Sequence, residues 1–441
     1  MSGVPTIAFA TLGCKTNQAE TVNLLAQLQA DLAVVPFDQG ADIYVINTCT
    51  VTHEADRQSR QLVRRALRHN PDARIVVTGC AVDYASAEFG RLPGVRLAAR
   101  NAQKDEIAGV VASWYGLTPG PERPPGPGAG GGHTRAWLKV AEGCANACSF
   151  CVIPAVRGAE RSVPAGELVA RARRLAEAGY REIVLTGTNI GSYGRDGASG
   201  LTRRAGRGTA RGATLAPLIE RLLAEVPEVA RWRVSSIEPI DFPDDLLAAF
   251  AHERVCPHVH LCLQSGSDRI LAAMRRRYNM ATYRRLVDRL RAARPGLTLT
   301  TDVIVGFPGE SEADFAATVD CLRDIGFAQV HLFPYSDRAG THAAGLPDHV
   351  GPAAIADRMD RAEAAVRDLH SRWQAGWVGK DADALVERVG DTWATGTTAH
   401  YLKVRIPAAA VRANQLRRVR VEAVGDGLAD ATPVDLAVTR D

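Results

Sequence analysis

The sequence has no long hydrophobic run. No apolar stretch approaches the roughly 18 residues that a membrane-spanning helix requires, so we expect no membrane span. Residues 1–9 lack a basic segment followed by an apolar stretch, and we therefore expect no export signal. An excess of positive charge is also lacking. The formal net charge is only +4 over 441 residues, so charge alone does not indicate a nucleic-acid-binding protein.

The sequence also lacks the signs of a disulfide framework. Nine cysteines are an odd number in a long chain, and at least six of them have local contexts suited to a metal. Disulfide frameworks are typical of short secreted proteins, whereas clustered thiols in a long chain are typical of metal sites. We therefore predict a reducing, cytoplasmic location.

One loop carries three closely spaced cysteines. Cys144, Cys148 and Cys151 stand at i, i+4 and i+7, and the alternating run 136–141 before them predicts a strand. The thiols thus follow a strand end, where α/β folds place their chemistry. A closed structural zinc site takes four ligands, whereas an iron–sulfur cube held by three cysteines keeps one iron open for a small molecule. We predict such a cluster; a zinc knuckle or three unconnected buried thiols are the alternatives.

The first part of the chain repeats a strand, a turn with one cysteine, and a helix. Strands are expected at 6–12, 42–47 and 74–78, and helices at 20–32 and 54–69. Strands joined by helical crossovers run parallel, so their carboxyl ends share the edge at which α/β sheets bind ligands. Cys14, Cys49 and Cys80 are therefore predicted to converge, the alternative being that each is a small buried hydrophobe.

The composition suggests where the domains divide. Residues 119–132 are almost wholly Pro and Gly, which is typical of a linker. We predict an N-terminal three-layer α/β domain at 1–117, a linker at 118–133, a second α/β domain at 134–378 and a small β-barrel domain at 379–441.

The second domain alternates strands and helices through six units. Strands are expected at 135–141, 181–186, 231–236, 258–263, 298–305 and 328–333, and helices at 164–178, 214–225, 243–252, 267–273, 280–293 and 311–325, with a long helix at 352–377. Six units predict a partial (β/α)6 barrel rather than a closed eightfold one. Polar and glycine residues follow the strand ends, as an active face requires.

The last sixty residues are rich in short β runs. Strands are expected at 384–389, 393–398, 401–406, 418–423 and 434–439. Five strands of this length predict a small barrel.

Several motifs resemble a known family. The Cys-x3-Cys-x2-Cys spacing after a strand resembles the radical S-adenosylmethionine (SAM) superfamily, and the longer string at 144–164 resembles its methylthiotransferases. The strings LGCKTNQAET, INTCTVTHEADRQSRQ and VTGCA match the second three-cysteine motif of that family. The first two also resemble the branch that acts on threonylcarbamoyladenosine in tRNA.

The resemblance implies cofactors and partners. It implies two [4Fe-4S] clusters, one on Cys144, Cys148 and Cys151 and one on Cys14, Cys49 and Cys80, together with SAM. It further implies the tRNA anticodon loop as substrate, an electron donor such as flavodoxin or ferredoxin, and a TRAM-like RNA-binding barrel at the C-terminus.

The resemblance also implies a set of SAM-binding residues. These are Thr188 and Asn189 near the methionine amino end, Ser235 and Gln264 at the ribose or carboxylate, and Ile304 and Val305 beside the adenine. For each residue, ordinary turn formation is an alternative role.

Two arginines after the cluster loop, Arg157 and Arg161, are expected in the active site or on RNA, because guanidinium suits carboxylates and phosphates. Helix-entry ion pairing is the alternative. The Gly- and Arg-rich run 195–213 is expected to be a loop, and either its arginines contact phosphates or it is a solvated insert. These arginines are Arg195, Arg203, Arg204, Arg207 and Arg211.

The function that follows from the resemblance is radical insertion of a methylthio group at C2 of N6-threonylcarbamoyladenosine next to the anticodon. Two alternatives stay open. One is a methylthiotransferase for isopentenyladenosine tRNA or a ribosomal protein, and the other is a non-catalytic Fe–S protein that binds RNA. No side chain is identified as a general acid or base.

Overall fold

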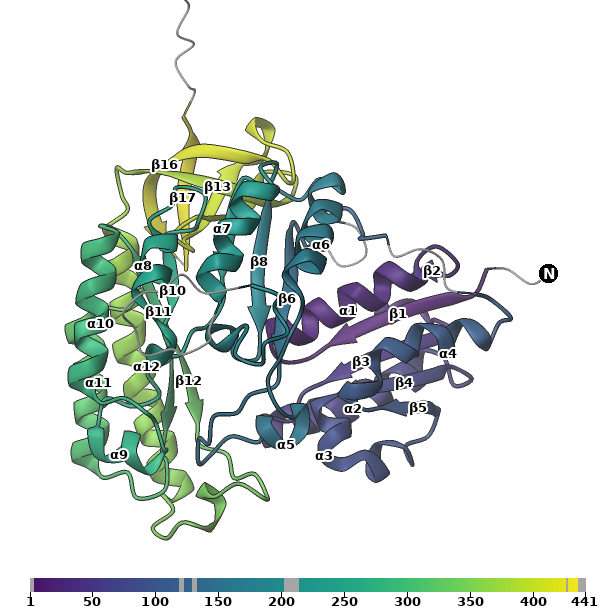
Figure 1. Cartoon of the computed structure of the whole chain (residues 1–441), viewed down its shortest axis with the longest axis horizontal. Coiled ribbons are helices and arrows are strands. Elements are labelled where there is room, and N and C mark those ends of the chain that lie inside the picture. The colour runs from purple at the N-terminus through teal and green to yellow at the C-terminus, as the bar shows by residue number, and fades with distance from the viewer. Residues whose placement is uncertain (1–3, 119–122, 129–132, 202–213, 426, 435–441) are drawn as a thin grey trace, which may run out of the picture.

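A computed structural model describes residues 4–118, 123–128, 133–201, 214–425 and 427–434. The first unit is an α/β layer structure (Figure 1). Its elements are β1 (Thr6–Thr11), α1 (Lys15–Leu28), β2 (Ala33–Val34), β3 (Ile43–Thr48), α2 (His53–His69), β4 (Arg74–Gly79), α3 (Cys80–Phe89), β5 (Val95–Ala99) and α4 (Ile107–Ser113). The five strands are parallel in the order β2-β1-β3-β4-β5. Separate apolar clusters pack on the two sheet faces, which makes three layers as predicted.

Helix α1 begins earlier than the sequence suggested. It was expected at 20–32 but runs from Lys15 to Leu28, directly after Cys14 in extended backbone. The apolar periodicity failed here because Asn17 and Glu20, on the buried side of the helix, are polar. These two side chains face charged groups of the next domain rather than an apolar core.

The second unit is the partial barrel. Its elements are β6 (Arg135–Glu142), α5 (Ile153–Arg157), β7 (Arg161–Ser162), α6 (Ala165–Glu177), β8 (Glu182–Gly187), α7 (Leu215–Glu225), β9 (Arg231–Val234), α8 (Asp244–Phe250), β10 (His258–His260), α9 (Asp268–Ala273), α10 (Met280–Ala293), β11 (Thr298–Val305), α11 (Glu312–Ile325), β12 (Gln329–Pro334) and α12 (Pro352–Ala375). Parallel pairs and single bridges join β6-β8-β9 to β10-β11-β12, and β6 and β12 do not pair with each other. The predicted partial (β/α)6 barrel is confirmed.

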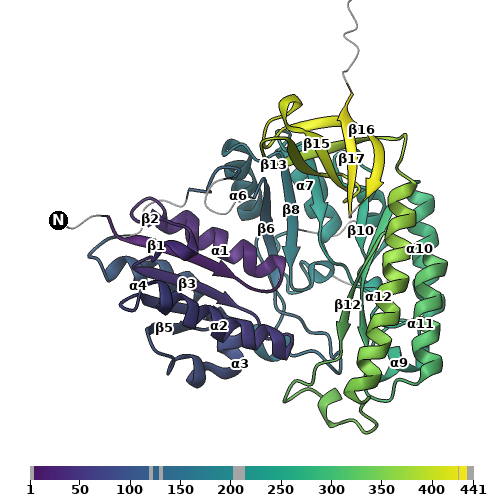
Figure 2. The ribbon, with the colours of Figure 1, turned by 180° about the vertical axis from the view of Figure 1, so that it is seen from behind.

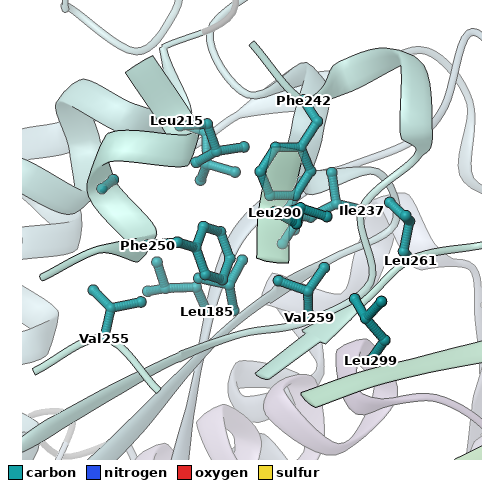
Figure 3. Packing of buried hydrophobic residues seen from close by; sticks show 14 of the residues in the cluster. Leu185, Leu215, Ile237, Phe242, Phe250, Val255, Val259, Leu261, Leu290 and Leu299 are labelled. Atoms are coloured by element: carbon teal, nitrogen blue, oxygen red, sulfur yellow. The ribbon is translucent and has the colours of Figure 1, made fainter. Parts of the chain in front are cut away.

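The apolar core of the barrel lies between the sheet and its outer helices. Figure 3 shows Phe250 beside Leu185 and Val255, and Phe242 beside Leu290 and Ile237, all in the main apolar cluster. Full burial of each such side chain contributes about 1.5–3 kcal/mol. This outer packing leaves the inner face of the sheet free for polar side chains.

The third unit is a closed five-stranded barrel with the strand order β13-β14-β15-β17-β16. Its strands are β13 (Asp381–Val389), β14 (Trp393–Thr398), β15 (Lys403–Pro407), β16 (Leu416–Gly425) and β17 (Leu428–Pro433). The fifth strand of the barrel is β17, and residues 435–439 of the strand expected at 434–439 lie outside the described part. β17 begins after Gly427, at φ +76°, and pairs antiparallel with β16, although its sequence has few branched apolar residues.

The small barrel closes one end of the partial barrel (Figures 1 and 2). Arg233 of β9 donates to the carbonyls of Thr398 and Ala399 at 3.1 and 3.0 Å, and Arg231 donates to two further carbonyls of the small barrel. Both arginines also pair with the fully buried Glu182. Burial opposes ionisation of Glu182, but the two guanidinium groups outweigh it and hold the pKa of the carboxyl below its usual range.

Part of the predicted linker packs against the protein. Residues 119–122 and 129–132 lie outside the described part; Arg123 lies against α1, whereas Gly126 accepts a hydrogen bond from Tyr180 at 3.5 Å. Arg123 donates from its backbone to the carbonyl of Ala26 at 3.1 Å. In the described residues, no helix is both long and apolar enough to cross a membrane.

Replacing Arg233 by alanine should lower the free energy of unfolding by about 3–5 kcal/mol, because it leaves Glu182 buried with one partner fewer. Arg367→Ala, which removes an exposed pair with Glu363, is the control and should cost less than about 1 kcal/mol. Urea unfolding measures both. Equal effects of the two substitutions would contradict this account of how the small barrel is held.

Candidate functional site

Three thiols of the N-terminal domain follow three neighbouring strands. Cys14 caps α1 after β1, Cys49 follows β3, and Cys80 begins α3 directly after β4. Gly13, at φ +86°, lies so close that an added Cβ would be 2.8 Å from the Cys49 sulfur. Burial raises the pKa of Cys49 to about 11, and the neighbouring Cys80 and Cys14 add to this. The structure thus brings the three cysteines together.

The cluster loop of the barrel is held by its backbone. At Gly143, with φ +77°, an added Cβ would lie 1.9 Å from the Ala159 carbonyl oxygen, so only glycine fits. The backbone of Asn146 donates to the Cys144 sulfur at 3.4 Å. Burial raises the pKa of Cys144 to about 11 and that of Cys151 to about 12.

Both thiol groups fit an iron–sulfur cluster. Buried thiols with raised pKa values stay protonated in water, and a metal cation binds by displacing those protons. Cys80 packs directly against Val152 and Val156, the residues that follow Cys151, so the two groups lie on either side of one small apolar contact. Six sulfurs in two sets of three suit two clusters, each with an open iron.

A cavity of about 200 Å³ lies beside Cys151. Its lining comes from both domains: Val51 and Thr52 after Cys49; Phe150, Cys151, Val152 and Ile153 of the cluster loop; and Gln264, Asp302, Ile304, Phe333, Pro334, Tyr335 and Ser336 of the barrel. The walls are mostly apolar and aromatic, with a few polar groups, as is typical of small-molecule sites.

Two of the six expected SAM-binding residues line this cavity, Gln264 and Ile304. Gln264 has φ +68°, a conformation that is strained for a non-glycine residue and concentrates at functional sites. Its backbone bonds on both sides to β11, through the carbonyl of Asp302 at 2.8 Å and the N–H of Ile304 at 3.0 Å.

The other four lie elsewhere. Thr188 Oγ1 and Asn189 Oδ1 are buried without a hydrogen-bond partner in the described residues, so each can still accept a hydrogen bond from a ligand. Ser235 is buried after β9. Val305 is a correction, because its side chain is 1% exposed and packs in the main core on the helix side of the sheet. Successive strand residues face opposite sides, so only Ile304 faces the cavity.

The two arginines after the cluster loop, Arg157 and Arg161, differ in burial. Arg157 is buried, and it donates to Glu20 at 2.9 Å, to Glu142 at 3.0 Å and to the Cys80 sulfur at 3.2 Å. Arg157 was expected in the active site or on RNA. The guanidinium is enclosed between the two domains, which rules out a contact with RNA, and it lies against Cys80, one of the expected cluster ligands. Arg161 stays about 60% exposed, with a loose contact to Glu142 at 3.7 Å.

Residues of the 195–213 run are only partly described. Arg195 pairs with the buried Asp241, which holds this arginine against the barrel. Arg203, Arg204, Arg207 and Arg211 lie outside the described residues.

A second arginine at the clusters was missed by the sequence analysis. Arg276 donates to the Cys148 sulfur at 3.1 Å and pairs with Glu238. The contact spans 128 positions, so no local spacing could reveal it. The only sequence signal was Glu238, which follows a predicted strand and needs a cation when buried.

Inside the barrel, His260, Asp302 and His331 bring their ligand atoms within 4.8 Å of one another. Burial lowers the pKa of His331, and the positive charge of Lys15 lowers it further. The same lysine acts on Asp302. A divalent cation at this site would be repelled by the positive charge of Lys15, and Asp302 is the one carboxylate of the three groups that would offset the repulsion. This disfavours a metal here.

Two family patterns match the chain. "Uncharacterized protein family UPF0004" matches residues 6–98, and "Radical SAM superfamily" matches residues 138–322. These segments hold the first and second groups of three cysteines, respectively.

Curated relatives match nearly the whole chain. The "Threonylcarbamoyladenosine tRNA methylthiotransferase MtaB" of Bacillus subtilis is 36% identical and covers 90% of both chains. The protein of the same name from Thermotoga maritima is 34% identical over 87% of this chain and 86% of its own. The "tRNA-2-methylthio-N(6)-dimethylallyladenosine synthase" of Nitratidesulfovibrio vulgaris is 34% identical over 88% and 89%.

Among solved structures, the radical SAM methyltransferase TsrM from Kitasatospora setae has a TM-score of 0.53 at 14% identity. The match covers 78% of this chain and 77% of that one, and it shows the fold alone.

Gly13→Ala should cost the protein the iron held by the N-terminal thiols, because the new methyl group would displace the Cys49 sulfur. Iron per chain after anaerobic reconstitution should fall from about eight to about four. Gly109→Ala, in an exposed position of α4 with no atom within 4 Å, is the control and should keep the wild-type iron content. Full iron in Gly13→Ala would contradict the placement of these thiols at a cluster.

Proposed function

The chain belongs to the radical SAM tRNA methylthiotransferases, and from that premise we propose that its substrate is N6-threonylcarbamoyladenosine in the anticodon loop of tRNA, methylthiolated at C2. The relatives named for this base and the Leu12–Lys15 run support the choice. The dimethylallyladenosine relative, at 34% identity, makes isopentenyladenosine the second candidate. One observation carries the proposal: a single cavity is lined by Cys151 of one thiol group and by Val51 and Thr52, which follow Cys49 of the other.

The family uses SAM and [4Fe-4S] clusters, and we assign the ligands by position. Cys144, Cys148 and Cys151 would hold the cluster at which SAM binds. Cys14, Cys49 and Cys80 would hold the other cluster. When bound, these groups supply the one-electron and sulfur-transfer chemistry that side chains lack.

The chain's own residues prepare the cavity for a nucleoside. Phe150, Ile304 and Phe333 form apolar walls that exclude water and offer stacking surfaces. Two backbone hydrogen bonds to β11 hold Gln264 in its strained conformation, and its side chain would orient a ribose or carboxylate. Asn189 Oδ1 and Thr188 Oγ1, still without partners, are suited to an ammonium group such as the methionine amino end of SAM.

The tRNA must reach this cavity between the domains. Arg161, exposed near the cluster loop, is the residue we assign to a phosphate. We also propose that the small barrel, in the domain at 379–441, contacts RNA. The other proposed divisions of the chain are the N-terminal domain at 1–117, the linker at 118–133 and the radical SAM domain at 134–378. In the small barrel, Arg418 and Arg420 are half exposed and pair with Asp381. A tRNA substrate and reduced thiols together support a cytoplasmic location.

We further propose that an acidic flavodoxin or ferredoxin donates the electron beside Cys148. Arg275 and Arg277 are exposed there and line a small pocket together with Asn146 and Cys148. Cationic side chains at the point where a cluster nears the surface would attract an acidic partner and speed its docking.

The substrate test is mass spectrometry of nucleosides from tRNA treated with reconstituted protein, SAM and reductant. Threonylcarbamoyl-modified tRNA should gain the 2-methylthio group, and isopentenyl-modified tRNA should not. Cys144→Ala should abolish the product. Cys321→Ala, a thiol buried in α11, is the matched control and should retain it. Product on isopentenyladenosine alone would overturn the substrate choice.

The donor test uses Arg275→Glu/Arg277→Glu. The ratio of the rate with flavodoxin to the rate with dithionite should fall about tenfold at low salt, and the difference should shrink at high salt because exposed charges are screened. Arg367→Glu, exposed on α12, is the control. An unchanged ratio would place the donor on another surface.

A further inference from the structure

One buried arginine reaches each group of three thiols. Arg157 Nε donates to the Cys80 sulfur at 3.2 Å, and Arg276 Nη1 donates to the Cys148 sulfur at 3.1 Å. Their side chains are only 1% and 3% exposed. The same contact, a buried guanidinium that donates a hydrogen bond to one cysteine sulfur, therefore occurs at both thiol groups.

Both arginines also pair with carboxylates, through guanidinium nitrogens other than the one that contacts the sulfur. Arg276 pairs with Glu238, and burial raises the pKa of that carboxyl. Arg157 pairs with Glu20 and Glu142. A buried charge without such partners would be strongly destabilising, so each pair exists to hold the cation at its place.

Several charged groups surround Arg157. Its partners Glu20 and Glu142 are shared with Lys104, Lys139 and, at 3.7 Å, Arg161, and Asp83 interacts with Lys104 and Arg157. Among these charges, the Arg157 guanidinium is the positive charge that contacts the Cys80 sulfur. Such a charge favours an added electron on any metal centre that this thiol holds.

We propose that Arg157 and Arg276 set the reduction potentials of the two clusters, Arg157 that of the N-terminal one and Arg276 that of the barrel one. The inference rests on the ligands assigned under the proposed function. A [4Fe-4S] cluster gains one negative charge on reduction, and N–H donors to its sulfurs and nearby positive charge stabilise that state. Each arginine would therefore raise the potential of the cluster it touches.

The two contacts differ in origin, which makes the proposal specific. Arg276 and Cys148 belong to the same barrel. Arg157 also comes from the barrel, from the end of α5, but Cys80 belongs to the N-terminal domain. The potential of the N-terminal cluster thus depends on a side chain supplied across the domain boundary.

The test measures each cluster alone in the full-length chain. One background carries Cys144→Ala/Cys148→Ala/Cys151→Ala, and the other carries Cys14→Ala/Cys49→Ala/Cys80→Ala. In each, potentiometric titration followed by electron paramagnetic resonance gives the potential with wild-type arginines, with Arg157→Gln and with Arg276→Gln. Iron content is measured first, and about four irons per chain in each background is required.

Each Gln variant should shift only its own cluster. The ratio of reduced to oxidised cluster at a fixed potential should fall at least about tenfold, which is about 59 mV for a one-electron couple. Lysine at the same position keeps the charge and should recover part of the shift. If the Gln variant fails to hold its cluster, the reduction potential is measured in the lysine variant instead.

Arg338→Gln is the matched control. Arg338 is also about 1% exposed and also crosses between the domains, to Asp56 and Thr50, but no contact to a sulfur is recorded for it in the described residues. Arg338→Gln should leave the reduction potentials of both clusters unchanged. A shift as large in Arg338→Gln, a shift of both clusters by either Gln variant, or no shift would overturn the proposal. If the two triple-alanine backgrounds do not hold iron, the assignment of the cysteines as cluster ligands is rejected instead.

Discussion

The buried ion-pair network between α1 and the barrel is the constraint on which the rest depends. Arg157, Lys104 and Lys139 all converge on Glu20, whose pKa is held well below its usual range by these cations despite burial. Because enclosed charges tolerate little displacement, the network fixes the N-terminal domain against the cluster loop. In this arrangement Cys80 lies against Val152, and Val51 and Thr52, which follow Cys49, reach the cavity that Cys151 lines.

Much of this arrangement could be predicted from the sequence. The repetition of strand, cysteine and helix was enough to place Cys14, Cys49 and Cys80 at one sheet edge, because parallel strands put their carboxyl ends together. Six strand–helix units likewise indicated an open barrel. The alternation within β11 should also have separated Ile304 from Val305, since only one of two successive residues can face the cavity.

The rest could not be predicted because it depends on contacts between distant segments. Arg157 and Cys80 are 77 positions apart, and Arg276 and Cys148 are 128 apart. Helix α1 was misplaced for a related reason. Its buried face carries Asn17 and Glu20, which are buried against charged partners rather than an apolar core, so hydrophobic periodicity does not mark it. Burial of polar residues at an interface is visible only once the partner is present.

Two clusters held by six thiols are central to the proposed function, and iron and labile sulfide per chain after anaerobic reconstitution test their presence most directly. We expect about eight irons in the wild type, about four when either group of three cysteines is replaced by alanine, and none when both are replaced. About four irons in the wild type, all lost with Cys144, Cys148 and Cys151, would contradict the account. Cys14, Cys49 and Cys80 would then be packing residues.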